Sequence, residues 1–140
     1  MGSATEGTRT KDKGQRTKDR ELLRFEDLGV WKRSVKLSVD IYKELYQLKD
    51  LGFKNQITRS GLSIPSNIAE GFERTSKKES INFLSYAAGS CGELRTQIYI
   101  GIDIGYINGT KGKEWLKEAN EISSMIKGLI KTRRKFTESK

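Results

Sequence analysis

Apolar residues recur every three or four positions from Leu28 to Phe136, and only short turns interrupt this pattern. The spacing matches the 3.6-residue turn of an α-helix, so each helix carries an apolar stripe that must be buried. No segment shows the strict alternation that is typical of a strand. A single proline in 140 residues also argues against a loop-rich β fold. The sequence therefore predicts a one-domain, all-α protein.

The first half of the pattern predicts two helices. Asp27 has the side chain of an N-cap residue for the first helix, which ends at Asp50–Gly52. The second helix spans about Phe53–Glu73 and contains Pro65, which removes one backbone hydrogen bond. We expect this helix either to kink at Ser63 or to restart there with Ser63 as its cap.

The second half predicts two more helices. Ser76–Glu79 has the form of a capping box, and the third helix runs from there to about Tyr106. Ile107–Thr110 forms the next turn, and the fourth helix ends in the basic run Lys131–Lys135. Four amphipathic helices joined by short turns predict an antiparallel up-down-up-down four-helix bundle over residues 25–140.

The first and third helices carry more apolar residues than one buried face needs. The main face of the first helix contains Leu28, Trp31, Val35, Tyr42 and Leu45. Additional stripes contain Val30, Leu37 and Ile41 on the first helix, and Tyr99, Ile100 and Ile104 on the third. A monomeric bundle hides one face per helix, so extra apolar stripes indicate a subunit interface. We therefore expect a homo-oligomer.

The chain carries 27 Lys and Arg against 18 Asp and Glu, a formal net charge of +9. This excess favours anionic partners, with RNA or DNA ahead of a membrane; the alternative is a basic surface without a binding role. No stretch approaches the ~20 apolar residues that span a bilayer. One cysteine, Cys91, excludes an intramolecular disulfide, and the N-terminus is polar. We expect a cytoplasmic protein that does not associate with membranes.

Residues 1–24 contain seven basic and four acidic residues and almost nothing apolar. This composition predicts a disordered basic tail in front of the bundle. The tail either contacts RNA as a flexible arm or only makes the chain more soluble.

Several common catalytic and metal sites need residues or motifs that this sequence lacks. It contains no histidine, which excludes His-based zinc sites and Ser-His or Cys-His nucleophile pairs. Neither of the common phosphate-binding glycine loops occurs. Cys91 lies on the apolar face of the third helix, where a structural thiol is expected rather than a nucleophile. We expect no cofactor, no metal site and no enzymatic activity.

The remaining candidates for chemistry are the three glutamates Glu70, Glu73 and Glu93. Paired carboxylates can serve acid–base catalysis, for example in a metal-dependent nuclease. The alternative, which we favour, is a network of salt bridges with Arg59, Arg74 or Arg95.

One end of the predicted bundle concentrates positive charge. This basic end, residues 26–33, 70–79 and 127–135, contains ten basic and five acidic residues, a balance of +5. The opposite end, residues 43–54 and 103–118, contains six basic and five acidic residues, a balance of +1. The exposed amides at the start of the third helix also favour phosphate. The predicted nucleic-acid-binding residues are Lys32, Arg33, Arg74, Lys77, Lys78, Lys131, Arg133, Arg134 and Lys135.

The most distinctive segment in the chain is Ser63–Gly71. It closely resembles the signature of the four-helix-bundle proteins encoded in bacterial 23S rRNA intervening sequences, and the resemblance covers about residues 25–136. Outside the segment, it is carried by Leu28–Lys32, Gln56, Arg59, Arg74 and Glu93–Leu94. Two features depart from the pattern: Lys54 replaces a small capping residue, and the basic tail lies outside it.

The resemblance implies an antiparallel four-helix bundle that assembles into a homopentameric ring. The family is also similar to the accessory variability determinant proteins of diversity-generating retroelements, which associate with a reverse transcriptase and nucleic acid. The resemblance to the intervening-sequence proteins implies no defined activity. The motif positions expected to be structural or at an interface are Gln56, Arg59, Ser63, Pro65, Asn67, Glu70, Gly71 and Glu93.

Ser63, Ser66, Asn67 and Glu70 fall on one stripe of the second helix. These side chains either satisfy the backbone groups that Pro65 frees or form hydrogen bonds across a subunit interface. From all these features we expect a nonenzymatic oligomer that binds RNA or DNA through its basic end. The alternative is a protein-interaction scaffold, or an accessory subunit of a polymerase, a reverse transcriptase or a ribosome factor.

Overall fold

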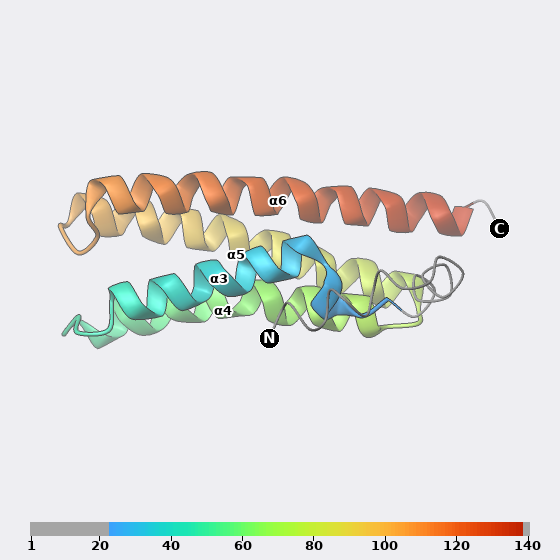
Figure 1. Cartoon of the computed structure of the whole chain (residues 1–140), viewed down its shortest axis with the longest axis horizontal. Coiled ribbons are helices and arrows are strands. Elements are labelled where there is room, and N and C mark those ends of the chain that lie inside the picture. The colour runs from blue at the N-terminus through green and yellow to red at the C-terminus, as the bar shows by residue number, and fades with distance from the viewer. Residues whose placement is uncertain (1–22, 139–140) are drawn as a thin grey trace, which may run out of the picture.

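The structure, a computed structural model, describes residues 23–138. A 3-10 turn at Phe25–Asp27 (η1) leads into α3 (Gly29–Glu44), α4 (Leu51–Glu73), α5 (Lys77–Asp103) and α6 (Gly109–Glu138). Each helix runs antiparallel to the one before it, and α6 extends beyond α3 at the end where α4 passes into α5 (Figure 1). No strand occurs among residues 23–138, so the predicted all-α bundle is confirmed. Most of the predicted basic tail, residues 1–22, lies outside the described residues.

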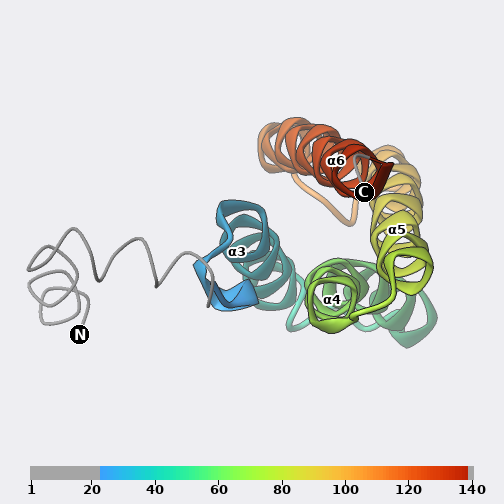
Figure 2. The ribbon, with the colours of Figure 1, turned by 90° about the vertical axis from the view of Figure 1, so that its right-hand side faces the viewer.

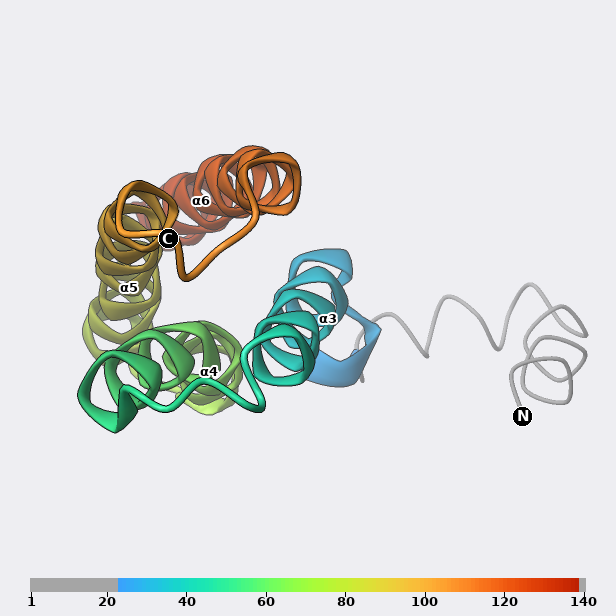
Figure 3. The same cartoon turned by 90° about the vertical axis from the view of Figure 1, so that its left-hand side faces the viewer.

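Seen along the bundle, the helices follow one another around a common core in the order α3, α4, α5 and α6 (Figures 2 and 3). Branched aliphatic side chains dominate that core. Its large, fully buried members are Ile41, Ile57, Ile64, Ile68, Leu94, Ile98, Ile122 and Ile126. None of the described helices is long and apolar enough to cross a membrane.

The prediction of which face of α3 is buried was wrong in part, although Leu45 of the expected main face is 3% exposed and belongs to the core. The stripe of Val30, Leu37 and Ile41, which we expected to face outward, is at most 5% exposed and belongs to the core. Tyr42, expected on the main buried face, is 44% exposed. The predicted outer stripe on α5, Tyr99, Ile100 and Ile104, is exposed as expected.

Small residues explain which stripe of α3 is buried. Ser34 and Ser38 flank the core stripe and are themselves buried. The position that a Cβ would take at Gly61 of α4 lies 3.8 Å from Ser38 Cα, so the two backbones come close together here. A stripe of large side chains does not permit such an approach.

The predicted cap at Ser76 is confirmed, and the predicted cap at Asp27 is not. Asp27 belongs to η1, where its Oδ2 accepts a hydrogen bond from the Arg24 amide, so the predicted cap of α3 was wrong; Leu28 holds that position without a side-chain bond. The other three helices begin at side-chain caps. Asp50, Ser76 and Asn108 each accept a bond from the amide three residues on, at 3.1, 3.2 and 3.0 Å.

Two boundaries differ from the sequence-based expectation. α4 continues through the buried Pro65, so the predicted restart at Ser63 does not occur. α5 ends at Asp103, earlier than expected, because Gly105 adopts a left-handed conformation with φ of 84°.

Candidate nucleic-acid interface

The turn between α4 and α5 lies at the centre of the basic end, and short contacts fix its shape. The buried hydroxyl of Ser80 donates a 2.6 Å hydrogen bond to the carbonyl of Gly71. A Cβ on Gly71 would lie 3.0 Å from both the Ser80 carbonyl oxygen and Leu84 Cγ. Gly71 of the family segment is therefore needed for close packing of α4 on α5.

Arg74 lies three residues after Gly71, and its guanidinium contacts two glutamates and one aromatic ring. Its Nη2 donates to Glu70 Oε1 at 2.7 Å, and its Nη1 lies 3.9 Å from Glu79 Oε1. The guanidinium carbon sits 4.9 Å from the ring centroid of Phe83. Of the predicted network, Glu70–Arg74 is present, whereas Glu73 and Glu93 form no ion pair within residues 23–138. The charge of Arg74 is largely compensated in place.

Arg33 points to the seam between α3 and α6 and not to the basic end. It donates to both carboxylate oxygens of Glu118, at 2.8 and 2.6 Å, and also to Glu121 Oε1. These hydrogen bonds raise the pKa of Arg33, and the bond from Arg33 lowers the pKa of Glu118. Arg33 thus joins two helices, and the structure gives no support to its predicted role in nucleic-acid binding.

The other predicted cations are less constrained. Arg133 of α6 donates from Nη2 to the Arg74 carbonyl at 3.2 Å, which ties the end of α6 to the turn. Six further side chains have no carboxylate within 4.0 Å among the described residues. These six, called the basic-end cations below, are Lys32, Lys77, Lys78, Lys131, Arg134 and Lys135.

The polar residues of the family segment form contacts within one chain. Ser63 Oγ lies 2.8 Å from Ser90 Oγ of α5, and Asn67 Nδ2 donates to both Ser63 Oγ and the Ser63 carbonyl at 2.9 Å. The carbonyl that loses its partner to Pro65 belongs to Gly61, and none of these bonds reaches it. The first of the two alternatives, that the polar set satisfies the freed group, therefore does not hold, and the Ser63–Asn67–Ser90 cluster links α4 to α5.

Three motif positions lie elsewhere on the surface. Gln56, Arg59 and Glu93 are exposed, and no hydrogen bond or ion pair within the described chain joins them to the serine–asparagine cluster. The structure therefore does not gather all the family positions into one site.

A cavity at the basic end was not predicted from the sequence. It has a volume of about 230 Å³ and lies between the start of α3, the end of α4, the start of α5 and the end of α6. Its lining residues are Leu28, Ile68, Phe72, Ser80, Leu84, Leu129, Thr132 and Arg133. The only signal in the sequence was a set of apolar residues near four helix ends, and the sequence does not show that these ends meet.

Groups suited to covalent or metal chemistry are scarce in the structure. Within the described residues, no three Cys, Asp or Glu side chains are grouped so that they could hold a metal ion. Burial raises the pKa of Cys91 to about 11, so its thiol stays protonated at neutral pH.

The model of the 23S rRNA-intervening sequence protein family matches residues 26–128. The chain belongs to this family. It is also similar to a crystal structure from Bacteroides thetaiotaomicron VPI-5482, described as a protein with unknown function from the S23 ribosomal protein family. The sequence identity is 29% and the TM-score 0.68, over 73% of this chain and 98% of that chain. No curated protein matches.

The family match divides the basic end in two. The intervening-sequence match contains the segment Ser63–Gly71 and the turn with Lys77 and Lys78, and it ends at residue 128. The basic run Lys131–Lys135 lies beyond the match, as do three residues that line the cavity, Leu129, Thr132 and Arg133.

Proposed function

We propose that this intervening-sequence protein is a nonenzymatic homo-oligomer that binds RNA or DNA through its basic end. The observation that carries the proposal is the group of six basic-end cations without carboxylate partners. Clustered, uncompensated cations attract the phosphate backbone and release its counterions. At the opposite end Lys111 lies close to Asp40 and Glu114, and Lys54 Nζ donates to the Tyr46 carbonyl. Lys43, Lys49, Lys113 and Lys117 have no carboxylate within 4.0 Å among the described residues either, so the two ends differ mainly in net charge, +5 against +1.

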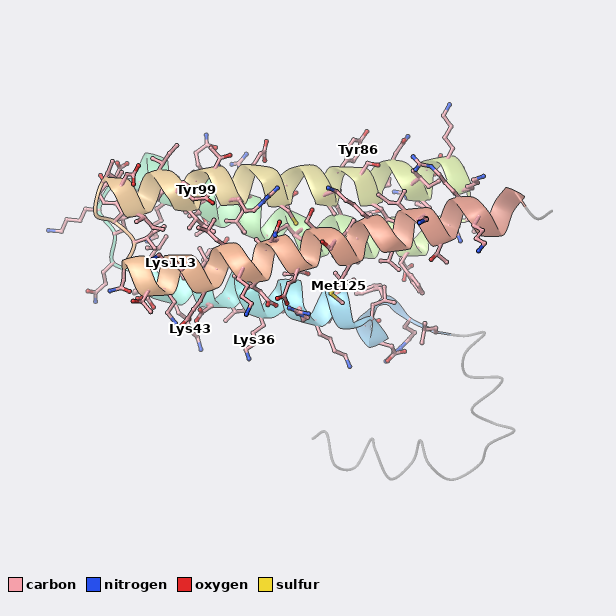
Figure 4. The ribbon with its side chains drawn as sticks, turned by 90° about the horizontal axis from the view of Figure 1, so that it is seen from above. Lys36, Lys43, Tyr86, Tyr99, Lys113 and Met125 are labelled. Atoms are coloured by element: carbon pink, nitrogen blue, oxygen red, sulfur yellow. The ribbon has the colours of Figure 1, made fainter. Side chains whose placement is uncertain are left out.

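Assembly into a homo-oligomer is supported by the apolar residues that remain on the outside of single helices. Val39 and Tyr42 lie on one side of α3, and Tyr46, just after the end of the helix, is 73% exposed. Figure 4 shows Tyr86 and Tyr99 along α5, at the edge of the view opposite to Lys36 and Lys43 of α3. Apolar helix surfaces of this extent favour burial against another subunit. The family resemblance makes five subunits the expected number.

The same exposed residues favour a second candidate, a protein-interaction scaffold whose partner covers the stripes. A polymerase, a reverse transcriptase or a ribosome factor is the expected kind of partner. Under this alternative the basic charge is incidental, and binding to nucleic acid would be weak everywhere on the surface.

Fluorescence anisotropy with labelled single-stranded RNA and DNA, measured over a range of salt concentrations, tests the proposal. In one variant Lys77, Lys78, Lys131 and Arg134 are replaced by Glu. The matched control replaces four exposed lysines outside the basic end, Lys36, Lys43, Lys49 and Lys113, three of which are labelled in Figure 4.

The basic-end variant should bind more weakly, and its salt slope should flatten by about 1 for each phosphate that it no longer neutralises. The control variant should change much less. Equal losses in both variants would replace a localised site by diffuse attraction. Absence of salt-dependent binding in the wild type would favour the scaffold.

A further inference from the structure

We propose that the cavity at the basic end receives one unpaired nucleobase of a single-stranded nucleic acid. This inference rests on the proposed function, and it names the class of nucleic acid: single-stranded ends or loops, in preference to a duplex. The cavity and the cations beside it would then act as one site, in which the cavity holds a base and the cations hold the flanking phosphates.

The walls of the cavity fit a flat, largely apolar group. Leu28, Ile68, Leu84 and Leu129 line it from four different parts of the chain, so the pocket exists only in the folded bundle. Its volume of about 230 Å³ is below the range of pockets that hold drug-sized ligands, which begins at about 300 Å³. A single base is a ligand of suitable size, and its removal from water would be favourable.

The remaining lining residues supply the features that recognise a base. Phe72 is 37% exposed and lines the cavity, where an aromatic side chain offers a surface on which a base can stack. Thr132 and Arg133 line the cavity too, and both side chains carry polar groups of the kind that bind a base edge or its sugar. Apolar walls, one aromatic ring and a few polar groups are the usual composition of sites for unpaired bases.

The charges around the cavity distinguish between its candidate occupants. Lys131 and Arg134 adjoin the lining residues Thr132 and Arg133, and Lys77 precedes the lining residue Ser80 by one helical turn. A second copy of this chain that placed its own basic end here would be disfavoured by like-charge repulsion. A polyanionic strand with an accessible base matches both the apolar interior and the positive surroundings. Bases in a duplex are stacked and paired, so they enter only after extrusion.

The test measures how much the bases themselves contribute to binding. A labelled single-stranded RNA is compared with a strand of equal length and charge that carries abasic sites, and with the fully paired duplex, at matched salt. Thr132→Trp fills the exposed mouth of the cavity, and Ser124→Trp places the same side chain at an exposed position two turns earlier on α6. Phe72→Leu keeps an apolar side chain and removes the aromatic ring.

The wild type should bind the natural strand about tenfold more tightly than the abasic strand, as expected for one stacked base. Thr132→Trp should abolish this preference and leave binding of the abasic strand and the salt slope unchanged. Phe72→Leu should reduce the preference, and Ser124→Trp should preserve it.

Three results would overturn the inference. They are equal wild-type affinity for the natural and abasic strands, equal loss of both affinities in Thr132→Trp, and a change of oligomer mass in that variant by light scattering. The last result would assign the cavity to a contact between copies. Salt-dependent binding without base preference would refute the cavity site alone, whereas no binding to any strand would refute the proposed function as well.

Discussion

Gly71 illustrates how a single position in the family segment is determined by its neighbours. The glycine lies in the last turn of α4, where the carbonyl of Ser80 and the side chain of Leu84 leave no space for a methyl group. Its own carbonyl accepts the Ser80 hydroxyl bond, so packing and hydrogen bonding depend on the same close approach. Helix propensity alone predicts that a glycine loosens a helix end, whereas this one holds the α4–α5 turn in place.

Gly71→Ala should therefore destabilise the protein by about 1–3 kcal/mol, because the added methyl group overpacks the α4–α5 contact. Gly89→Ala is the matched control, since a Cβ at Gly89 of α5 meets nothing within 4 Å. That substitution should stabilise the helix by about 0.5–1 kcal/mol through its lower conformational entropy cost. Urea unfolding of both variants measures these changes. A neutral Gly71→Ala would show that the α4–α5 contact relaxes without cost.

At the scale of the element, α3 has two apolar faces. One face is buried against α4 and the core, and the other carries Val39 and Tyr42 on the outside, with the exposed Tyr46 just after the helix end. The polar side of α3 turns toward α6, where Asp40 Oδ2 accepts a 2.9 Å hydrogen bond from the Trp115 indole. One helix therefore has a core surface, a polar seam and an exposed apolar stripe.

Val39→Glu should dissociate the proposed homo-oligomer, because a carboxylate in an apolar subunit contact loses its hydration without gaining a partner. Lys36→Glu introduces the same side chain on the same helix, outside the apolar stripe, and should leave the assembly intact. Size-exclusion chromatography with light scattering measures both masses, and circular dichroism verifies that each variant stays helical. A wild-type monomer at tens of micromolar would contradict the proposed assembly.

At the scale of the whole molecule, the bundle is closed by the seam between the first and last helices. Arg33 reaches Glu118 and Glu121 across this seam, and Lys111 Nζ lies 3.6 Å from Asp40 Oδ2. The α4–α5 contact on the opposite side of the bundle (Figure 2) consists instead mainly of buried aliphatic and small residues. Polar pairs that water can reach contribute little each, so the seam is the weakest of the four helix contacts.

The seam should make stability depend on pH in acid. The hydrogen bond from Arg33 lowers the pKa of Glu118 below its ordinary 4.5 in the folded protein. The stabilisation that the ionised Glu118 gives to the folded protein is therefore complete above its ordinary pKa. This stabilisation is lost as the pH falls through the lower pKa of Glu118 in the folded state. The Arg33 and Glu118 side chains are 37% and 32% exposed, so solvent screening limits the contribution to at most about 1 kcal/mol.

Glu118→Gln should consequently lower stability at pH 7 and have little effect at an acidic pH below the lowered folded pKa of Glu118, where the wild-type carboxylate is protonated too. Glu93→Gln, at an exposed glutamate without an ion pair among the described residues, is the control and should change neither value. Urea unfolding of the three proteins at both pH values gives the comparison. A loss for Glu118→Gln that is independent of pH would assign its role to packing.

The sequence by itself determined the helices, the Ser76 cap and the family. Helical periodicity and capping depend on residues within about one turn of each other, so local spacing suffices to predict them. Asp50, Ser76 and Asn108 lie at or beside the predicted turns and each caps the helix that follows.

The tertiary structure alone decided which stripe of α3 is buried, which partners Arg33 has, and that a cavity exists at the basic end. Both apolar stripes of α3 repeat with the period of an α-helix, so the spacing does not show which one is buried. The rotation of α3 about its axis, set by the close approach to Gly61, decides this. Arg33 and Glu118 are 85 positions apart, and the cavity joins the ends of four helices. Such contacts depend on how rigid helices are rotated and shifted against one another, which local spacing does not specify.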